Sequence, residues 1–172
     1  MIAFCRRSRQ NTQRRNAVEQ EIIDIYSKSD DKTASLLSNF SHFPFTLDGI
    51  RCEGMEGFLQ SLKFFRKSTQ RKVCALWGKP AKEAGTEQKI WKRLRLVHWN
   101  GKLYRRSGKA FSLLIGRAYH QMYLDNPEFR RALESSRGKR LAHSMGGHSK
   151  AETILTEEEF VGHLNRLRDG KP

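Results

Sequence analysis

The alternation of apolar and polar positions predicts a small sheet near the start of the chain. Residues 22–27 form a short apolar run that ends in polar residues, as a strand followed by a loop does. A second extended stretch, 43–47, is separated from residues 50–52 by Asp48-Gly49. Asp-Gly between two such runs is a strong hairpin signal, because both central residues of that turn need positive φ. We therefore expect an antiparallel hairpin at this turn.

After Gly54 the pattern changes to that of helices. Large apolar residues recur there at spacings of three and four: Met55, Phe58, Leu59, Leu62 and Phe65. They give the expected helix one apolar face of about three turns. Similar patterns predict further helices over residues 69–77, 86–97 and 105–125.

We expect the chain to close with an amphipathic helix. Thr156 followed by Glu159 forms a capping-box pattern ahead of the apolar positions in 160–167. Upstream, Pro127 is well placed to begin a short helix that ends near Ser136. Together these elements predict an α+β fold: a mostly helical single domain with a small antiparallel sheet or hairpin near its N-terminus.

The composition narrows the class of protein. A chain of 172 residues suits one domain, and no apolar run approaches the ~20 residues that a membrane-spanning helix needs. The three cysteines include no Cys-x-x-Cys pair, which indicates neither a disulfide scaffold nor a cysteine-built zinc site. We expect an intracellular, cytoplasmic protein. Residues 1–18 are interpreted as a disordered basic arm, with a transit peptide as the alternative, and residues 19–172 as the folded domain.

The positive charge is concentrated in one third of the chain. Overall, 33 basic and 18 acidic residues give a net charge of +15. Residues 63–117 alone hold 16 basic residues and only two acids, Glu83 and Glu87, a net charge of +14. Such a segment attracts polyanions, although a solvated surface without a partner is the alternative. We expect nucleic acid or a phosphate-rich substrate as the partner, and no membrane.

One helix carries a candidate set of polar side chains. Glu56, Gln60 and Lys63 lie at i, i+4 and i+7, so they project from one face. Because the same helix also carries large apolar residues, this stripe either faces solvent as a surface network or lines a pocket. The spacing leaves both interpretations open.

An ordered pattern of motifs surrounds this stripe. It comprises Ser38-Asn39-Phe40, Pro44-Phe45, Asp48-Gly49, Glu56, Gln60 and Lys63-Phe64. The pattern resembles the start of the NADAR (NAD- and ADP-ribose-associated) family, whose members include the riboflavin-intermediate N-glycosidase. That family shows Ser-Asn-Phe, a following Pro, an Asp-Gly turn and Ser-Glu-His…Gln-Ala-x-Lys-Phe. Weaker similarity covers most of residues 22–168, so the resemblance implies a NADAR-like N-glycosidase domain over residues 19–172.

The resemblance implies a hydrolase that cleaves an N-glycosidic bond between a ribose and a base or amine. Glu56 matches the family's catalytic glutamate, and Lys63 matches the lysine thought to form a transient Schiff base with the sugar. The implied substrate is ADP-ribose on guanine in DNA or RNA, or an ADP-ribose-like ligand, and no cofactor is expected. The implied substrate-binding residues are Ser38, Asn39, Phe40 and Gln60, together with a tryptophan, Trp91 or Trp99.

The chemistry of the cleavage suits these side chains. Breaking a glycosidic bond leaves positive character on the anomeric carbon and negative charge on the leaving base. A carboxylate offsets the first, and its acid form protonates the second or activates water. A lysine amine becomes nucleophilic when burial or nearby positive charge lowers its pKa.

Two glycines and two histidines are further candidates. The backbone at Gly146-Gly147 can approach a phosphate closely, although a simple turn explains both glycines equally well. His143 and His148 are the nearest pair among six histidines, but a spacing of five does not place them together on a helix. We expect no metal site.

Departures from the family pattern keep other functions open. Gly57 stands where the family has histidine, and residues 143–160 differ from its Trp-Gly-rich loop. One alternative is the same reaction on small phosphoribosyl-amine intermediates of the riboflavin pathway. The other is an inactive, basic nucleic-acid-binding protein on the same scaffold. The sequence leaves the oligomeric state undetermined.

Overall fold

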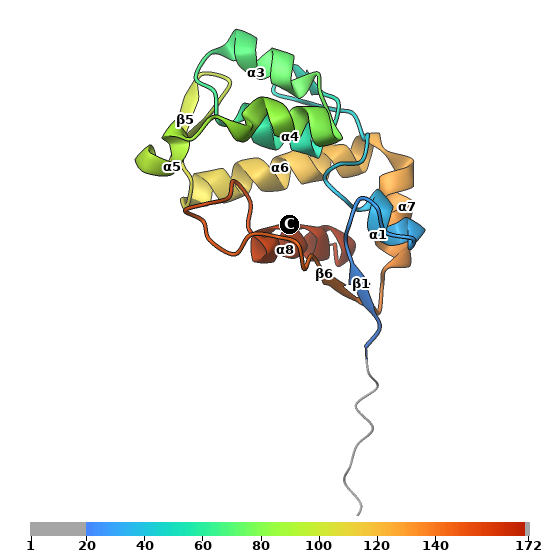
Figure 1. The fold of residues 1–172 in the computed structure, drawn as a ribbon. Coiled ribbons are helices and arrows are strands. Elements are labelled where there is room, and N and C mark those ends of the chain that lie inside the picture. Colours follow the sequence, from blue (N-terminus) through green and yellow to red (C-terminus); the bar gives the residue numbers. More distant parts are fainter. Residues whose placement is uncertain (1–19, 171–172) are drawn as a thin grey trace, which may run out of the picture.

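In a computed structural model, the described part of the chain, residues 20–170, folds into eight helices and six short strands (Figure 1). The helices are α1 Lys32–Leu36, α2 Met55–Ser61, α3 Lys67–Cys74, α4 Gly78–Thr86, α5 Ile90–Leu94, α6 Lys109–Asp125, α7 Pro127–Ser135 and α8 Glu157–Arg168. The strands are β1 Ile22–Asp24, β2 Phe45–Leu47, β3 Ile50–Cys52, β4 Leu96–Trp99, β5 Lys102–Arg105 and β6 Arg140–Ala142. The expected α+β domain is confirmed, while the expected basic arm, residues 1–18, lies outside the described residues.

The hairpin expected near the N-terminus is confirmed. Strands β2 and β3 pair antiparallel, with Leu47 opposite Ile50. Asp48 and Gly49 form the turn with φ of 49° and 74°. Positive φ at both positions is what the right-handed twist of the two strands requires of a two-residue turn.

A second hairpin replaces parts of two expected helices. Strands β4 and β5 pair antiparallel around Asn100-Gly101, whose φ values are 45° and 83°. The helices expected over 86–97 and 105–125 are therefore wrong where they include these strands. Asn-Gly is as strong a hairpin signal as Asp-Gly, and it identifies this turn from the sequence.

The first strand pairs with a strand near the other end of the domain and not with the N-terminal hairpin. β1 pairs in parallel with β6, and Ile23 lies opposite Leu141. A parallel pair needs a long connection, and here nearly the whole domain lies between the two strands. The strand itself was predictable, but a partner so distant in sequence was not.

Of the helices expected from the sequence, some have nearly the expected bounds and one ends early. α3, α7 and α8 lie close to the expected ranges, and α8 has the expected capping box, with the Thr156 side chain accepting from the backbone of Glu159. α2 ends at Ser61, so Phe65 is not on its apolar face. Phe65 is half-exposed and its ring lies 4.0 Å from that of His98.

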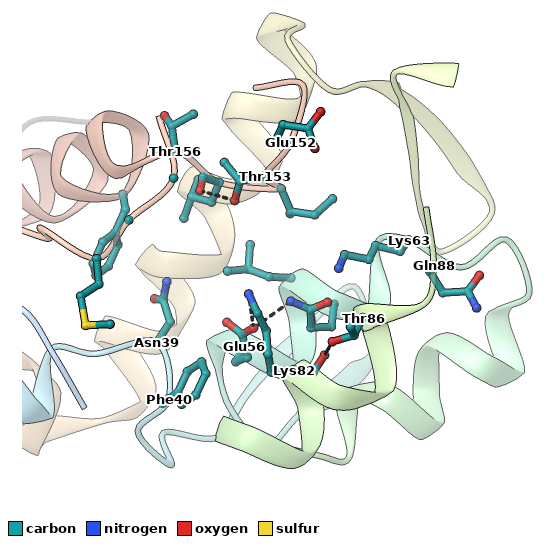
Figure 2. Close-up of a pocket in the computed structure, with 18 of the residues that line it drawn as sticks. Asn39, Phe40, Glu56, Lys63, Lys82, Thr86, Gln88, Glu152, Thr153 and Thr156 are labelled. Atoms are coloured by element: carbon teal, nitrogen blue, oxygen red, sulfur yellow. Dashed lines mark hydrogen bonds and ion pairs between the residues drawn. The ribbon is translucent and has the colours of Figure 1, made fainter. Parts of the chain in front are cut away.

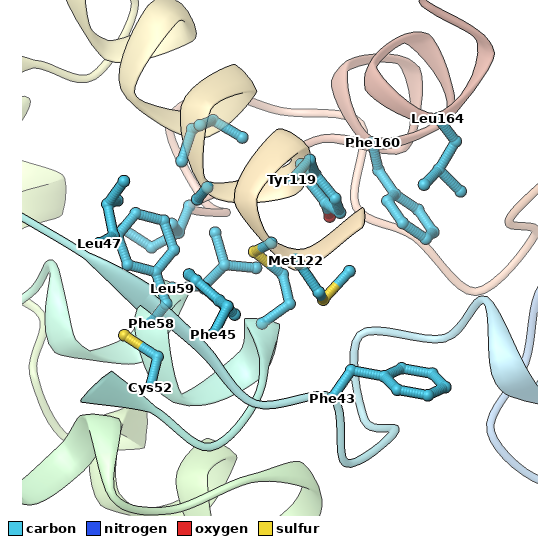
Figure 3. Packing of buried hydrophobic residues seen from close by; sticks show 14 of the residues in the cluster. Phe43, Phe45, Leu47, Cys52, Phe58, Leu59, Tyr119, Met122, Phe160 and Leu164 are labelled. Atoms are coloured by element: carbon cyan, nitrogen blue, oxygen red, sulfur yellow. The ribbon is translucent and has the colours of Figure 1, made fainter. Parts of the chain in front are cut away.

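The helix α6 crosses the middle of the molecule and joins its two halves (Figure 1). Its buried residues recur at helical spacing on one face: Phe111, Leu114, Ile115, Ala118, Tyr119 and Met122. Figure 3 shows Tyr119 and Met122 between the β2–β3 side of the core and Phe160 and Leu164 of α8. Burial of this face links the two sides of the apolar core.

The cationic segment, residues 63–117, forms one half of the molecule. Its α3, α4, α5 and β4–β5 hairpin lie together on one side of α6 in Figure 1, and its last residues form the start of α6. On the other side lie α1, β1, β6 and α8. No helix within residues 20–170 is long and apolar enough to cross a membrane.

Candidate active site

A cavity of about 330 Å³ lies between the two halves of the molecule (Figure 2). Its floor comes from α2 and the preceding loop 38–40, and one side from α4, α5 and the residues between them. The opposite wall comes from residues 143–156 and Phe160 of α8. The cavity therefore joins the cationic half to the C-terminal part of the chain.

The expected polar stripe lines this cavity and does not face solvent. Every residue of α2 is buried, which is typical of a helix inside a domain. Glu56, in the first turn of α2, keeps only 5% of its surface exposed. Its Oε1 accepts a 2.8 Å hydrogen bond from Gln60 Nε2 and lies 3.6 Å from Lys82 Nζ of α4. The carboxylate is thus held by one amide and one ammonium group (Figure 2).

Lys63 follows α2 and still reaches the same cavity. Its Nζ donates a 2.9 Å hydrogen bond to the carbonyl oxygen of Gly85 and lies 6.0 Å from the ring centroid of Trp91. Burial, and then the positive charges of Lys82 and Lys92, together lower the pKa of Lys63 from 10.5 to about 8, against the opposing effect of Glu56. At pH 7 about a tenth of this amine is therefore neutral, far more than for an exposed lysine, and the neutral form is the one that acts as a nucleophile.

Gly85 controls how closely α4 approaches these residues. A Cβ on Gly85 would lie 2.0 Å from Gln60 Oε1, so only glycine leaves room for the Gln60 side chain. The same residue supplies the carbonyl that binds Lys63. Gln60 Oε1 is buried and has no hydrogen-bond partner within the described residues. Gln60 is thus held by its amide nitrogen on Glu56 and by packing against Gly85.

The Ser38-Asn39-Phe40 motif forms the edge of the floor. Tyr119 donates a 2.7 Å hydrogen bond to Asn39 Oδ1, and the Asn39 carbonyl accepts from the backbone nitrogen of Glu56. Figure 2 shows the Asn39 nitrogen directed towards the open space. Ser38 Oγ accepts from the backbone nitrogen of Phe40, which holds the turn.

The two candidate tryptophans are separated by the fold. Trp91 is buried and lines the cavity. Trp99 is not among the lining residues: its ring packs edge-on against Phe58, and its Nε1 donates a 2.8 Å hydrogen bond to Asp48. The structure therefore brings Trp91, and not Trp99, to Glu56 and Lys63.

The expected glycines lie on the wall opposite Glu56, where packing explains them. A Cβ on Gly146 would lie 2.7 Å from the His143 ring, and one on Gly147 would lie 3.2 Å from Thr153. This wall is anchored from the other half of the molecule. Arg106, only 1% exposed, donates to both oxygens of Glu159 and to the carbonyl of Thr153.

Within residues 20–170, no three His, Cys, Asp or Glu side chains gather as metal ligands would. His143 lies in the cavity wall, where its Nδ1 is 2.7 Å from the carbonyl oxygen of Ile25. His148 is exposed and lies 3.5 Å from Glu157. Glu157 also accepts a hydrogen bond from the backbone nitrogen of His143, so both histidines take part in the structure of this wall.

A family model described as Bacteriophage protein GP30.3 matches residues 31–169. The chain belongs to this family. A relative from Enterobacteria phage T4, described as an uncharacterized 17.1 kDa protein in the Gp30-rIII intergenic region, is 41% identical over 134 residues. That match covers 77% of this chain and 88% of the T4 protein.

Among solved structures, the NMR structure of the E. coli protein YbiA has the same fold. The TM-score is 0.58, over 92% of this chain and 89% of YbiA, at 21% sequence identity. YbiA is a NADAR-family protein, so this member of the GP30.3 family has a NADAR-like fold.

Gly57, the departure from the NADAR pattern, has a physical reason in this GP30.3 protein. A Cβ at this position would lie 2.1 Å from the carbonyl oxygen of Leu76 and 3.1 Å from that of Val73. The end of α3 packs directly on α2 here, so no side chain fits. A histidine at residue 57 is excluded by this packing and could not join the cavity.

Sequence reasoning missed several residues of the cavity. Lys82, Lys92, Glu152, Thr153 and Thr156 all line it, from segments that lie far apart along the chain. Both lysines belong to the cationic segment, but nothing in the sequence separates the lysines that line the cavity from those on the surface. Glu152 has no motif around it, and only the fold brings it to the cavity.

Proposed function

We propose that this protein is an N-glycosidase that removes ADP-ribose from guanine bases in nucleic acid. The observation that carries the proposal is the cavity shared by Glu56 and Lys63. One is a buried carboxylate, and the other is an amine with a pKa of about 8. A perturbed lysine beside a buried acid in a cavity is a typical arrangement of reacting groups.

In the proposed reaction, the bond between the anomeric carbon and the guanine nitrogen breaks, and its electron pair leaves with the base. The Glu56 carboxylate offsets the positive charge that develops on that carbon. The neutral amine of Lys63 takes the place of the base, and the proton that it loses passes through Glu56 to the base. The sugar ring then opens to a Schiff base, which water hydrolyses to release ADP-ribose and restore the amine.

The surroundings of the two groups fit this sequence of steps. Gln60 and Lys82 fix one oxygen of Glu56, which leaves the other oxygen for the sugar. The Asn39 amide supplies a neutral donor for sugar hydroxyls at the edge of the floor. Trp91 offers an apolar face beside the amine of Lys63.

The charge of the cationic half supports a polymeric substrate. Within residues 20–170, many exposed basic side chains on this half make no ion pair; they include Arg66, Lys67, Arg71, Lys72, Arg93, Arg95, Lys102 and Arg105. Unpaired surface cations attract a phosphate backbone, and α4 and α5 carry this charge to the rim of the cavity. A base projecting from a bound strand would then meet the cavity directly.

The test is to incubate the protein with DNA and RNA that carry ADP-ribosylated guanine, and to measure release of ADP-ribose. Glu56→Gln and Lys63→Ala are each expected to lower kcat at least about 100-fold. Glu83→Gln is the matched control, because Glu83 is exposed and lies outside the cavity. Full turnover in either cavity variant removes that residue from the mechanism.

Two other outcomes would replace the proposal. Turnover of small phosphoribosyl-amines, with polymer turnover either absent or no more sensitive to salt than theirs, would assign a small-molecule substrate. Retained DNA affinity without release of sugar from any ribosylated base would assign a binding protein.

A further inference from the structure

An ion pair crosses the cavity between the two halves of the molecule. Nζ of Lys92, on α5, lies 2.5 Å from Oε2 of Glu152, in the loop that precedes α8. Both residues line the cavity, and sixty positions separate them in the sequence. Figure 2 shows Glu152 on the wall facing Lys63 and Lys82.

This ion pair is not what holds the two halves together. The side chains of Lys92 and Glu152 are 36% and 70% exposed, and exposed ion pairs contribute little to stability. The nearby Arg106–Glu159 pair is buried and makes two parallel hydrogen bonds. The wall is therefore anchored without Glu152, whose carboxylate is free to be exchanged for another anion.

The cavity is rich in cations for its size. Four lysines line it, namely Lys63, Lys82, Lys89 and Lys92. The acids that line it are Glu56 on the floor and Glu152 on the wall. Since Glu56 is engaged by Gln60 and Lys82, Glu152 is the anion that balances the outer lysines.

We propose that Lys92 binds a phosphate group of the substrate and that the Glu152 carboxylate occupies the position of this phosphate when the cavity is empty. The inference rests on the proposed N-glycosidase function, and it assigns the substrate class as phosphorylated sugars, with ADP-ribose as the probe. Nothing covalent changes: one anion replaces another on the same ammonium group.

The positions of the two lysines fit such a substrate. Lys63 Nζ and Lys92 Nζ both lie 6.0 Å from the ring centroid of Trp91, so they are within twice that distance of each other. A ribose with its phosphate spans such a gap, with the anomeric carbon near Lys63 and the phosphate on Lys92. The diphosphate of ADP-ribose carries two negative charges and more acceptor oxygens than one carboxylate, so it displaces an exposed Glu152.

The experiment measures binding of ADP-ribose and of adenosine by calorimetry at low salt, without any catalytic step. Glu152→Gln is expected to tighten ADP-ribose binding roughly fivefold, because it removes the competing anion. Lys92→Gln is expected to weaken it about tenfold or more, and adenosine binding should change in neither variant. In the double variant the gain from Glu152→Gln should vanish, because the two residues act on one interaction.

Glu83→Gln and Lys79→Gln are the matched controls. These residues form an exposed pair on α4 outside the cavity, so each variant changes the net charge equally without touching Lys92. Equal affinities for wild type and Glu152→Gln, an equal gain from Glu83→Gln, or no ADP-ribose binding by any variant would each overturn the inference.

The two proposals fail separately. A protein that shows the expected pattern of affinities but releases no ADP-ribose from guanine refutes the proposed function and retains the phosphate position. If the protein releases ADP-ribose from guanine but substitutions of Lys92 and Glu152 leave its affinity for ADP-ribose unchanged, the proposed function stands and the phosphate position is refuted.

Discussion

The hydroxyl of Tyr119 donates a 2.7 Å hydrogen bond to Oδ1 of Asn39, across eighty residues of sequence. Tyr119 is buried in the middle of α6, and burial raises its pKa well above the usual range, so the phenol keeps its proton. Because the side-chain oxygen Oδ1 of Asn39 accepts this hydrogen bond, the side-chain nitrogen is the group presented to the cavity. A core residue therefore sets which face of Asn39 a ligand meets.

Removing this hydroxyl should loosen Asn39 without emptying the cavity. Tyr119→Phe is expected to lower kcat/KM about tenfold and the free energy of unfolding by ~1 kcal/mol, because Asn39 loses its orienting bond. Steady-state kinetics and urea unfolding measure the two effects. Tyr123→Phe, on the same helix but bonded to the exposed Glu134, is the control. Equal activity of both variants would show that Asn39 needs no orientation by Tyr119.

The reactivity of Lys63 should follow the charge of Lys82. Since the pKa of Lys63 is about 8, its neutral amine accumulates as the pH rises through that value. Lys82→Gln removes a nearby positive charge and should move the midpoint roughly half a pH unit upward. Acylation of Lys63 by an amine-specific reagent, followed by mass spectrometry across a pH series, measures this without any substrate.

Lys79→Gln is the control for this titration, because Lys79 lies on the same helix and pairs with Glu83. Its midpoint should match that of wild type. A midpoint that stays fixed in Lys82→Gln would mean that the charge of Lys82 does not contribute to the lowered pKa of Lys63.

Position 57 should not tolerate any side chain. Gly57→Ala forces a Cβ to within 2.1 Å of the Leu76 carbonyl oxygen, and it is expected to cost about 2 kcal/mol or more in the free energy of unfolding. Urea unfolding measures this cost. Gly162→Ala in α8, where a Cβ meets nothing within 4 Å, should instead be neutral or stabilising. Equal stabilities of the two variants would contradict the close packing of α2 on α3.

Acid should destabilise the fold partly through His163. Burial, then the neighbouring charge of Arg166, lowers the pKa of His163 from 6.5 to about 4. Below pH 6.5 the unfolded chain therefore binds a proton that the native state does not, so stability falls as the pH drops from 6.5 to about 4. The full loss from this group is on the order of 3 kcal/mol.

His163→Gln should remove this component. Urea unfolding of wild type and variant across the same pH window gives the difference, and His120→Gln, at an exposed position of α6, is the control. If the two proteins lose stability in parallel, His163 does not stay neutral in the native state.

Local signals in the sequence predicted individual elements well and their partners poorly. The Asp48-Gly49 turn and the capping box at Thr156 depend on a few adjacent residues, so both were predictable. The partner of β1 is strand β6, more than a hundred residues away, and no local pattern records it. The β4–β5 hairpin has its signal at Asn100-Gly101, but the flanking residues also repeat at helical spacing, and this periodicity favours the wrong element.

By itself the sequence determined the α+β class, the motif around Glu56 and Lys63 and the concentration of charge in residues 63–117, because each follows from residue types and short spacings. Only the tertiary structure decided that the polar stripe lines a cavity, because the burial of α2 depends on α3 and α4 packing over it. It likewise separated Trp91 from Trp99 and brought Glu152 to Lys92. Such contacts join distant segments through the packing of the whole domain, and no local spacing encodes them.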